Sequence, residues 1–181
     1  KQNEYLKLNL EVGRKVRGDN YGLLRGSWTT EFGTLNQYVH LWEYPSLDER
    51  DRLRGELARN DEWTKEYVPR IRGLMLAQEN KILSPQLPLK PPADSGWLYE
   101  LRTYTLIPDK QAEYLKLNVE VGRKIRGHDY GRLAGSWTTE FGTLNQYVHR
   151  WEYPSLDERE RLRGALAKNE AWSKEYVPKI R

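Results

Sequence analysis

One stretch of fifteen residues, Gly26 to His40, returns without a single change as Gly135 to His149. The surrounding sequence repeats at the same offset of 109 residues, and 57 of the 72 aligned positions between residues 1–72 and 110–181 are identical. A fixed-period duplication at this spacing predicts two similar folding units. Whatever the sequence predicts for one copy it therefore predicts for the other.

Within each copy, helix and strand patterns alternate. Apolar residues three or four apart predict an amphipathic helix over residues 1–18 and its copy 109–127, with Asp109 as the N-cap. Two stretches rich in Trp, Thr, Tyr and Val, residues 24–30 and 35–44, predict a β-hairpin. Ser46 and Glu49 then form a capping box that opens a second helix.

The segment between the copies occurs only once. Residues 74–83 are expected to form a strand, the proline-rich residues 84–96 an extended linker, and residues 97–106 a strand of strong β formers. Read from residue 97, the order is strand, helix, strand, strand, helix, strand. This order is typical of the ferredoxin-like fold, an α+β architecture with antiparallel sheets and helices on the outer face.

The expected domains are a first repeat over 1–83 that lacks its opening strand, a linker over 84–96, and a second repeat over 97–181 that lacks its closing strand. Open strand edges tend to pair with other chains. We therefore expect a homo-oligomer or strand exchange between chains.

Composition and motifs argue against several classes of function. The net charge is only +4 and basic residues are interleaved with acidic ones, so no nucleic-acid partner is expected. Cysteine is absent, which excludes disulfides and thiolate chemistry. No membrane span is expected, and we predict a soluble, cytoplasmic protein. The three histidines lack metal-ligand spacing and no glycine-rich phosphate loop is present, so neither a metal nor a cofactor is expected.

The sequence resembles the NIPSNAP family. The resemblance rests on the strand Tyr99–Tyr104, on the hairpin stretch from Trp137 to Gln146 with His149 and Trp151, and on Tyr153–Arg159. It implies ferredoxin-like domains of the dimeric α+β-barrel type, an architecture shared with cofactor-independent monooxygenases. It also implies mitochondria as a second candidate compartment. The near identity of the copies indicates a recent duplication, a designed concatenation or an ancestor-like sequence, and the order of the elements also fits an engineered or permuted arrangement.

Side chains alternate along a strand, and this defines the candidate site. One face of the hairpin strand carries Asn36, Tyr38, His40, Trp42 and Tyr44, repeated as Asn145, Tyr147, His149, Trp151 and Tyr153. Glu100, Arg102 and Tyr104 share a face of the strand over 97–106. If helices cover the other face, this polar and aromatic face is expected to line an incompletely filled barrel interior.

Three functions fit this face. The first is small-molecule binding by Asn36, Trp42, Asn145, Trp151, Glu100, Arg102 and Tyr104. The second is a cofactor-independent monooxygenase-like reaction, with His40 and His149 as general bases and Tyr38 and Tyr147 as hydrogen-bond donors. The third is a purely structural or assembly role, in which the histidines are half-buried and Glu100 pairs with Arg102.

Overall fold

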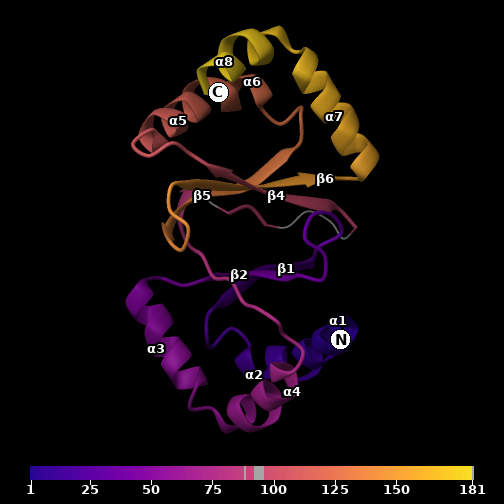
Figure 1. The fold of residues 1–181 in the computed structure, drawn as a ribbon, viewed down its shortest axis with the longest axis vertical. Helices are drawn as coiled ribbons and strands as arrows, with labels where there is room; N and C mark the ends of the chain where they lie inside the picture. The colour runs from indigo at the N-terminus through magenta and orange to yellow at the C-terminus, as the bar shows by residue number, and fades with distance from the viewer. Residues whose placement is uncertain (88, 92–95, 181) are drawn as a thin grey trace. The chain divides into compact units, whose positions relative to one another are not determined.

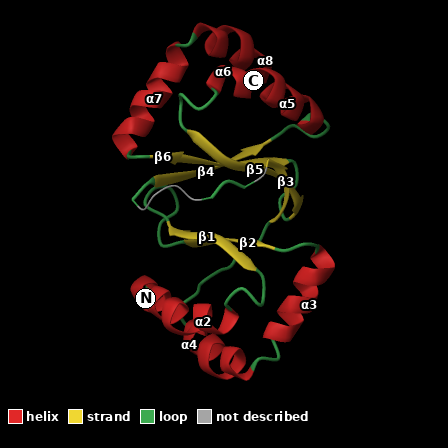
Figure 2. Cartoon of the chain, turned by 180° about the vertical axis from the view of Figure 1, so that it is seen from behind, coloured by secondary structure: helices red, strands yellow, loops and turns green. Residues whose placement is uncertain are grey.

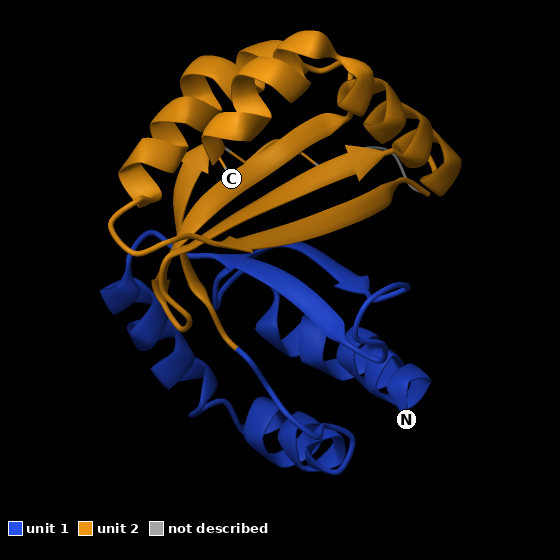
Figure 3. Ribbon diagram, turned by 45° about the horizontal axis from the view of Figure 1, so that its top comes forward, with its two compact units in different colours: residues 1–79 blue, residues 80–181 orange. Residues whose placement is uncertain are grey.

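The computed structural model describes residues 1–87, 89–91 and 96–180. The chain divides into two compact units, Lys1–Glu79 and Asn80–Arg181 (Figure 3). In each unit an antiparallel sheet carries its helices on one face (Figures 1 and 2). The predicted α+β, ferredoxin-like class with antiparallel sheets is confirmed.

Unit 1 contains a two-stranded antiparallel sheet of β1 and β2. Its elements are α1 (Gln2–Leu8), the π-helix η1 (Asn9–Gly13), α2 (Arg14–Arg17), β1 (Leu23–Thr29), β2 (Tyr38–Glu43), α3 (Leu47–Leu57), the π-helix η2 (Glu62–Tyr67) and α4 (Val68–Arg72). Leu8, Tyr67 and Ile71 form its buried core. The predicted hairpin is confirmed, with strand ends shifted by a few residues.

Unit 2 contains a four-stranded antiparallel sheet in the order β3-β5-β6-β4. Its elements are β3 (Ile82–Leu87), β4 (Leu98–Thr105), α5 (Gln111–Leu117), the π-helix η3 (Asn118–Gly122), α6 (Arg123–Arg126), β5 (Arg132–Phe141), β6 (Gln146–Tyr153), α7 (Leu156–Lys168), the π-helix η4 (Ala171–Tyr176) and α8 (Val177–Ile180). Leu133, Trp151 and Tyr153 form a buried cluster under Leu162 of α7.

Strand β3 differs from the sequence-based expectation. The strand expected over 74–83 lies at Ile82–Leu87 instead, and four residues of the expected linker are part of it. It pairs with β5 at the edge of the sheet of unit 2, so the boundary between the units falls before it. An edge position tolerates Pro85, which has no N–H to donate. Residues 88 and 92–95 of the expected linker lie outside the described residues.

The residues that cap the helices differ in part from the sequence-based expectation. Lys110, and not Asp109, is the N-cap of α5, because Asp109 adopts a left-handed backbone conformation with φ 67°. Ser155 does cap α7, accepting a hydrogen bond from the amide of Glu158 over 3.1 Å. The carboxylate of Glu158 accepts from Arg161 over 2.6 Å and 2.8 Å. The hydrogen bond to the serine of the predicted capping box is thus confirmed. The Glu158 side chain forms a surface ion pair with Arg161 instead of the second hydrogen bond of the box.

Candidate functional site between the helices and the sheet of unit 2

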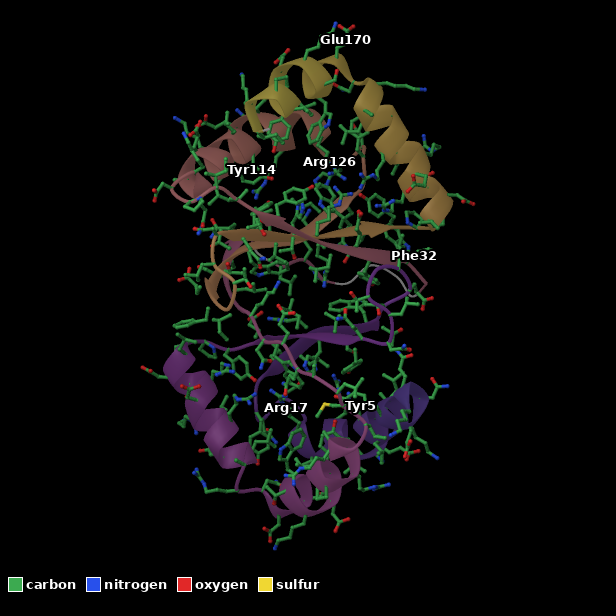
Figure 4. The ribbon with its side chains drawn as sticks, in the orientation of Figure 1. Tyr5, Arg17, Phe32, Tyr114, Arg126 and Glu170 are labelled. Carbon is green, nitrogen blue, oxygen red and sulfur yellow. The ribbon has the colours of Figure 1, made fainter. Side chains whose placement is uncertain are left out.

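The aromatic face of β6 points toward the helices. The ring of Tyr114 on α5 lies 5.4 Å from the ring of Tyr147, and the guanidinium of Arg126 on α6 lies 3.3 Å above the ring of Trp151. Figure 4 shows Tyr114 and Arg126 between the helices and the sheet. This corrects the expectation that the face lines an interior on the opposite side. Both faces of β6 carry polar residues, so alternation by itself did not reveal which one the helices cover.

The side chains between the helices and the sheet of unit 2 form a layer, and His149 lies at its centre. Its side chain is 4% exposed, and it is surrounded by the rings of Tyr104 at 4.8 Å, Tyr147 at 4.9 Å and Trp151 at 5.9 Å. Trp151 Nε1 donates a hydrogen bond to His149 Nδ1 over 3.1 Å. Because an indole nitrogen can only donate, Nδ1 must accept, and the proton of the neutral imidazole is on Nε2.

The charge state of His149 follows from its surroundings. Burial, with smaller contributions from the charges of Arg102 and Arg126, lowers the pKa of His149 to about 3. At neutral pH the side chain is therefore a neutral donor. Among the described residues, its Nε2 has no hydrogen-bond partner.

Strand β4 brings a carboxylate and a guanidinium to the same layer. Arg102 is opposite His149 in the register of β4 and β6, and it donates to Glu100. Glu100 also accepts hydrogen bonds from Arg159 and Arg163 of α7. Burial acts to raise the pKa of Glu100, but the hydrogen bonds from Arg102 and Arg159 outweigh it and lower the pKa to about 2. The predicted pairing of Glu100 with Arg102 is confirmed.

Arg126 and Arg123 complete the layer from the helix side. Arg126 is 6% exposed and donates to the hydroxyl of Tyr153 over 2.9 Å, and burial lowers its pKa to about 10. Arg123 donates to Ser136 Oγ over 3.1 Å and to the hydroxyl of Tyr147 over 3.3 Å. Within the described residues neither guanidinium forms an ion pair with a carboxylate, so the positive charge of the layer exceeds its negative charge.

The layer also holds several buried donors without acceptors. In the described part of the chain, the Nε atoms of Arg102 and Arg126 lack hydrogen-bond partners, as does Nε2 of His149. Unpaired buried donors are costly, about 1–3 kcal/mol each. Such a set is chemically suited to an acceptor, above all to an anionic oxygen.

Unit 1 repeats the layer without strand β4. Arg17 is 3.4 Å above the ring of Trp42 and donates to the hydroxyl of Tyr44. Tyr38 and His40 lie with their rings 5.3 Å apart. His40 is exposed, however, because no strand of the described chain pairs with the second edge of β2.

Asn36 and Asn145 stand apart from the other predicted site residues. Both precede their strands and adopt left-handed backbone conformations, with φ 59° and 57°. Asparagine tolerates this region better than most residues. The backbone conformation thus accounts for asparagine at these positions in the turn.

Sequence reasoning missed the helix residues of the layer. No role was assigned from the sequence to Arg123 and Arg126, or to Arg14 and Arg17 of unit 1. The available signal was the pattern Arg-Lys-x-Arg-Gly, which is the same in both copies. The π-helix η3 hid it, because an inserted π turn shifts the buried face away from ordinary helical spacing.

Two further findings concern metal binding and membrane insertion. Over the described ranges, no group of three or more His, Cys, Asp or Glu side chains is placed to hold a metal ion. In the same part of the chain, no helix combines the length and the apolar character that crossing a bilayer requires.

Fold and site together define an α+β protein with a cationic, aromatic layer between its helices and sheet. The sequence model of the NIPSNAP family matches residues 1–87 and 99–181, and the chain belongs to this family. The resemblance seen in the sequence is confirmed.

Two relatives agree with this assignment, and a solved structure shares the fold. The chain is 31% identical to a NipSnap homolog from Dictyostelium discoideum over 87% of its own length and 70% of the relative, and 32% identical to human NipSnap homolog 3A over 88% and 64%. The chain thus spans about two thirds of the length of these relatives. A candidate monooxygenase from Lactobacillus acidophilus shares the fold, with a TM-score of 0.62 over 98% of this chain and 79% of that one, at 13% identity.

Proposed function

We propose that unit 2 binds a small molecule with an anionic oxygen between its helices and sheet, at His149, Arg102 and Arg126. The observation that carries this proposal is the set of unpartnered buried donors on these three side chains. Of the residues in the sequence-based binding hypothesis, this proposal keeps Arg102 and Trp151. It adds His149, which was predicted as a general base, and Arg126, which was not predicted, and it moves the site to the helix side of the sheet.

The aromatic surroundings favour a ligand with a flat apolar part. Trp151 is 5% exposed and Tyr147 fully buried, and rings of this kind stack against planar groups. An aromatic carboxylate or phenolate combines such a ring with an oxygen that can accept from His149 and the guanidinium groups. Arginine provides two parallel donors to a carboxylate.

Binding is better supported than the monooxygenase-like alternative. A general base works best when its pKa is near the operating pH. The pKa of His149, about 3, makes it a weak base at neutral pH. The likeness to the candidate monooxygenase concerns the fold. The purely structural role predicts that no ligand binds. The ligand-binding test described next also tests this role.

The test compares benzoate with its neutral analogue benzamide. We expect benzoate, salicylate or inorganic phosphate to raise the melting temperature of unit 2, while benzamide does not. A ligand at ten times its dissociation constant stabilises by about 1.4 kcal/mol, which is several degrees for a unit of this size. His149→Phe keeps an aromatic ring and removes Nε2–H, so it should abolish the shift. His40→Phe, the matched change in the exposed copy, should leave the shift intact.

Perturbation of NMR signals provides a second readout where a variant folds poorly. Benzoate should move the indole signal of Trp151 in the native chain. If none of these anions shifts the melting temperature or this signal, the layer is a structural core and the proposal fails.

Two sequence-based predictions stay predictions. The first is self-association or strand exchange between chains, which size-exclusion chromatography with light scattering measures. Cytoplasmic rather than mitochondrial localisation is measured by cell fractionation of a tagged full-length protein.

A further inference from the structure

Unit 1 carries a pocket at the point where the chain leaves helix α4. It is lined by Val68, Ile71 and Arg72 of α4 and by the loop over residues 75–78. Its volume is about 250 Å³. All of these residues belong to unit 1.

The loop after α4 folds so that apolar side chains are left at the surface. The amide of Leu74 donates to the carbonyl of Ile71 over 2.9 Å, and the Leu74 side chain packs against the buried core of unit 1. With Leu74 directed inward, Met75 is 42% exposed and Leu76 is fully exposed. Two consecutive exposed apolar residues beside a pocket are typical of a surface that binds an apolar group.

The lining of the pocket is aliphatic. Val68 and Ile71 are three residues apart on one face of α4, and Ile71 belongs to the core. Met75 has a flexible side chain that adapts to irregular shapes. Among the described residues, no aromatic side chain lines the pocket. These contacts suit a flexible hydrocarbon chain better than a flat ring.

Arg72 is the charged residue of the lining. Its side chain is exposed, and in the part of the chain that the structure describes no carboxylate lines the pocket or pairs with this guanidinium. A guanidinium offers two parallel donors to a carboxylate. Charge complementarity therefore favours a ligand that joins an apolar chain to an anionic head group.

We propose that this pocket binds a short aliphatic carboxylate, with its chain against Val68, Ile71 and Leu76 and its head group at Arg72. Drug-sized ligands occupy pockets of roughly 300–1,000 Å³, so the smaller volume here favours a short chain over a long one. The proposal is independent of ligand binding in unit 2, because it rests on other residues and on a different ligand chemistry.

The test follows the methyl signal of Met75 by NMR. The chain contains one methionine, so ¹³C labelling of methionine methyl groups gives a single signal, which reports on this pocket. Butanoate, hexanoate and octanoate should move it, and the affinity should rise about fourfold for each added methylene that enters the pocket. Benzoate, the probe for unit 2, should leave the signal in place.

Two analogues separate the contribution of the charge from that of the chain. Octanol has the same chain without a charge, and octylammonium carries the opposite charge. Octanol should bind about threefold more weakly than octanoate, as expected for the loss of one exposed ion pair. Octylammonium should bind more weakly still, because its charge is repelled by Arg72.

Substitutions then assign the effect to this pocket. Arg72→Gln should lower the affinity for octanoate to that for octanol. Arg70→Gln is the matched control, because Arg70 lies on the same helix but does not line this pocket. Leu76→Asp should abolish binding of both ligands. Since Leu76 is fully exposed, this variant should keep the native melting temperature.

Four results would overturn the proposal. The first is a Met75 signal that none of the carboxylates moves. The second is equal binding of octanoate and octanol to the native chain. The third is an effect of Arg70→Gln as large as that of Arg72→Gln. The fourth is a Met75 signal that moves with protein concentration alone, which would make a second copy of the chain the occupant.

Discussion

Gly122 lies so close to the ring of Tyr176 that an added Cβ atom would be 2.5 Å from the nearest ring carbon. The two residues belong to the π-helices η3 and η4, which cross at this point. The same contact recurs between Gly13 and Tyr67, at 2.6 Å. The glycine is therefore required by close approach, since Gly122 leads into α6 with ordinary helical backbone angles.

Gly122→Ala should destabilise unit 2 although alanine is the better helix former. Tyr176 is 1% exposed and cannot swing aside, so we expect a loss of about 1–2 kcal/mol after the helix gain is included. Gly164→Ala is the control, because Gly164 lies within α7 with open space at its Cβ position. It should stabilise by about 0.5–1 kcal/mol. Urea unfolding followed by tryptophan fluorescence measures both, and equal effects would contradict the contact argument.

His149 should make unfolding depend on pH. Its folded pKa, about 3, is below the unfolded value of about 6.5, so the unfolded chain binds a proton first as the pH falls. The contribution of neutral His149 to the free energy of unfolding is therefore complete above about pH 6.5 and decreases from there toward pH 3. The expected loss between pH 7 and 5.5 is about 1 kcal/mol.

His149→Gln should flatten the pH dependence of the unfolding free energy between pH 7 and 5.5. His40→Gln is the matched comparison and should change it less: burial, with the charge of Arg17, lowers the pKa of His40 too, but His40 is exposed whereas His149 is 4% exposed. A titration of the His149 ring near pH 6 by NMR would refute the buried neutral state.

Glu100→Gln should destabilise unit 2 by removing the carboxylate from the layer. Arg102 and Arg159 would lose their charged acceptor, which costs about 2 kcal/mol at pH 7. The folded pKa of Glu100, about 2, is below its unfolded value, so the native stabilisation is complete above about pH 4.5 and declines toward pH 2. The variant should lack this decline in denaturant titrations. Glu113→Gln, in an exposed pair with Lys110, should behave like the native chain.

Ser155→Ala should shorten α7 at its start. Ser155 Oγ accepts from the amide of Glu158, and loss of such a cap costs about 1 kcal/mol. Ser46→Ala removes the same cap from α3, over the same 3.1 Å distance, and should cost unit 1 a similar amount. Hydrogen exchange at Glu158 and Glu49 follows each change locally. Protection that is unaffected by both substitutions would show that tertiary packing, and not the cap, holds the helix ends.

Local patterns predicted the elements well. The hairpin, the Ser46 and Ser155 caps and the pairing of Glu100 with Arg102 all depend on residues near one another in sequence or in strand register. Strand β3 was misplaced because its partner, β5, is far along the chain. The burial of Arg126 was missed because an isolated helix pattern does not show which tyrosines and tryptophans will lie beneath it.

The repeated stretch itself separates the two contributions. Its sequence determined that residues 26–40 and 135–149 form a hairpin, and which side chains share a face. Only the tertiary structure decided how far each strand extends and what is buried. β1 ends at Thr29 whereas β5 continues to Phe141, because β3 supplies hydrogen-bond partners at that edge. His40 is exposed and His149 is 4% exposed for the corresponding reason at the other edge, where β4 covers one copy of an identical sequence.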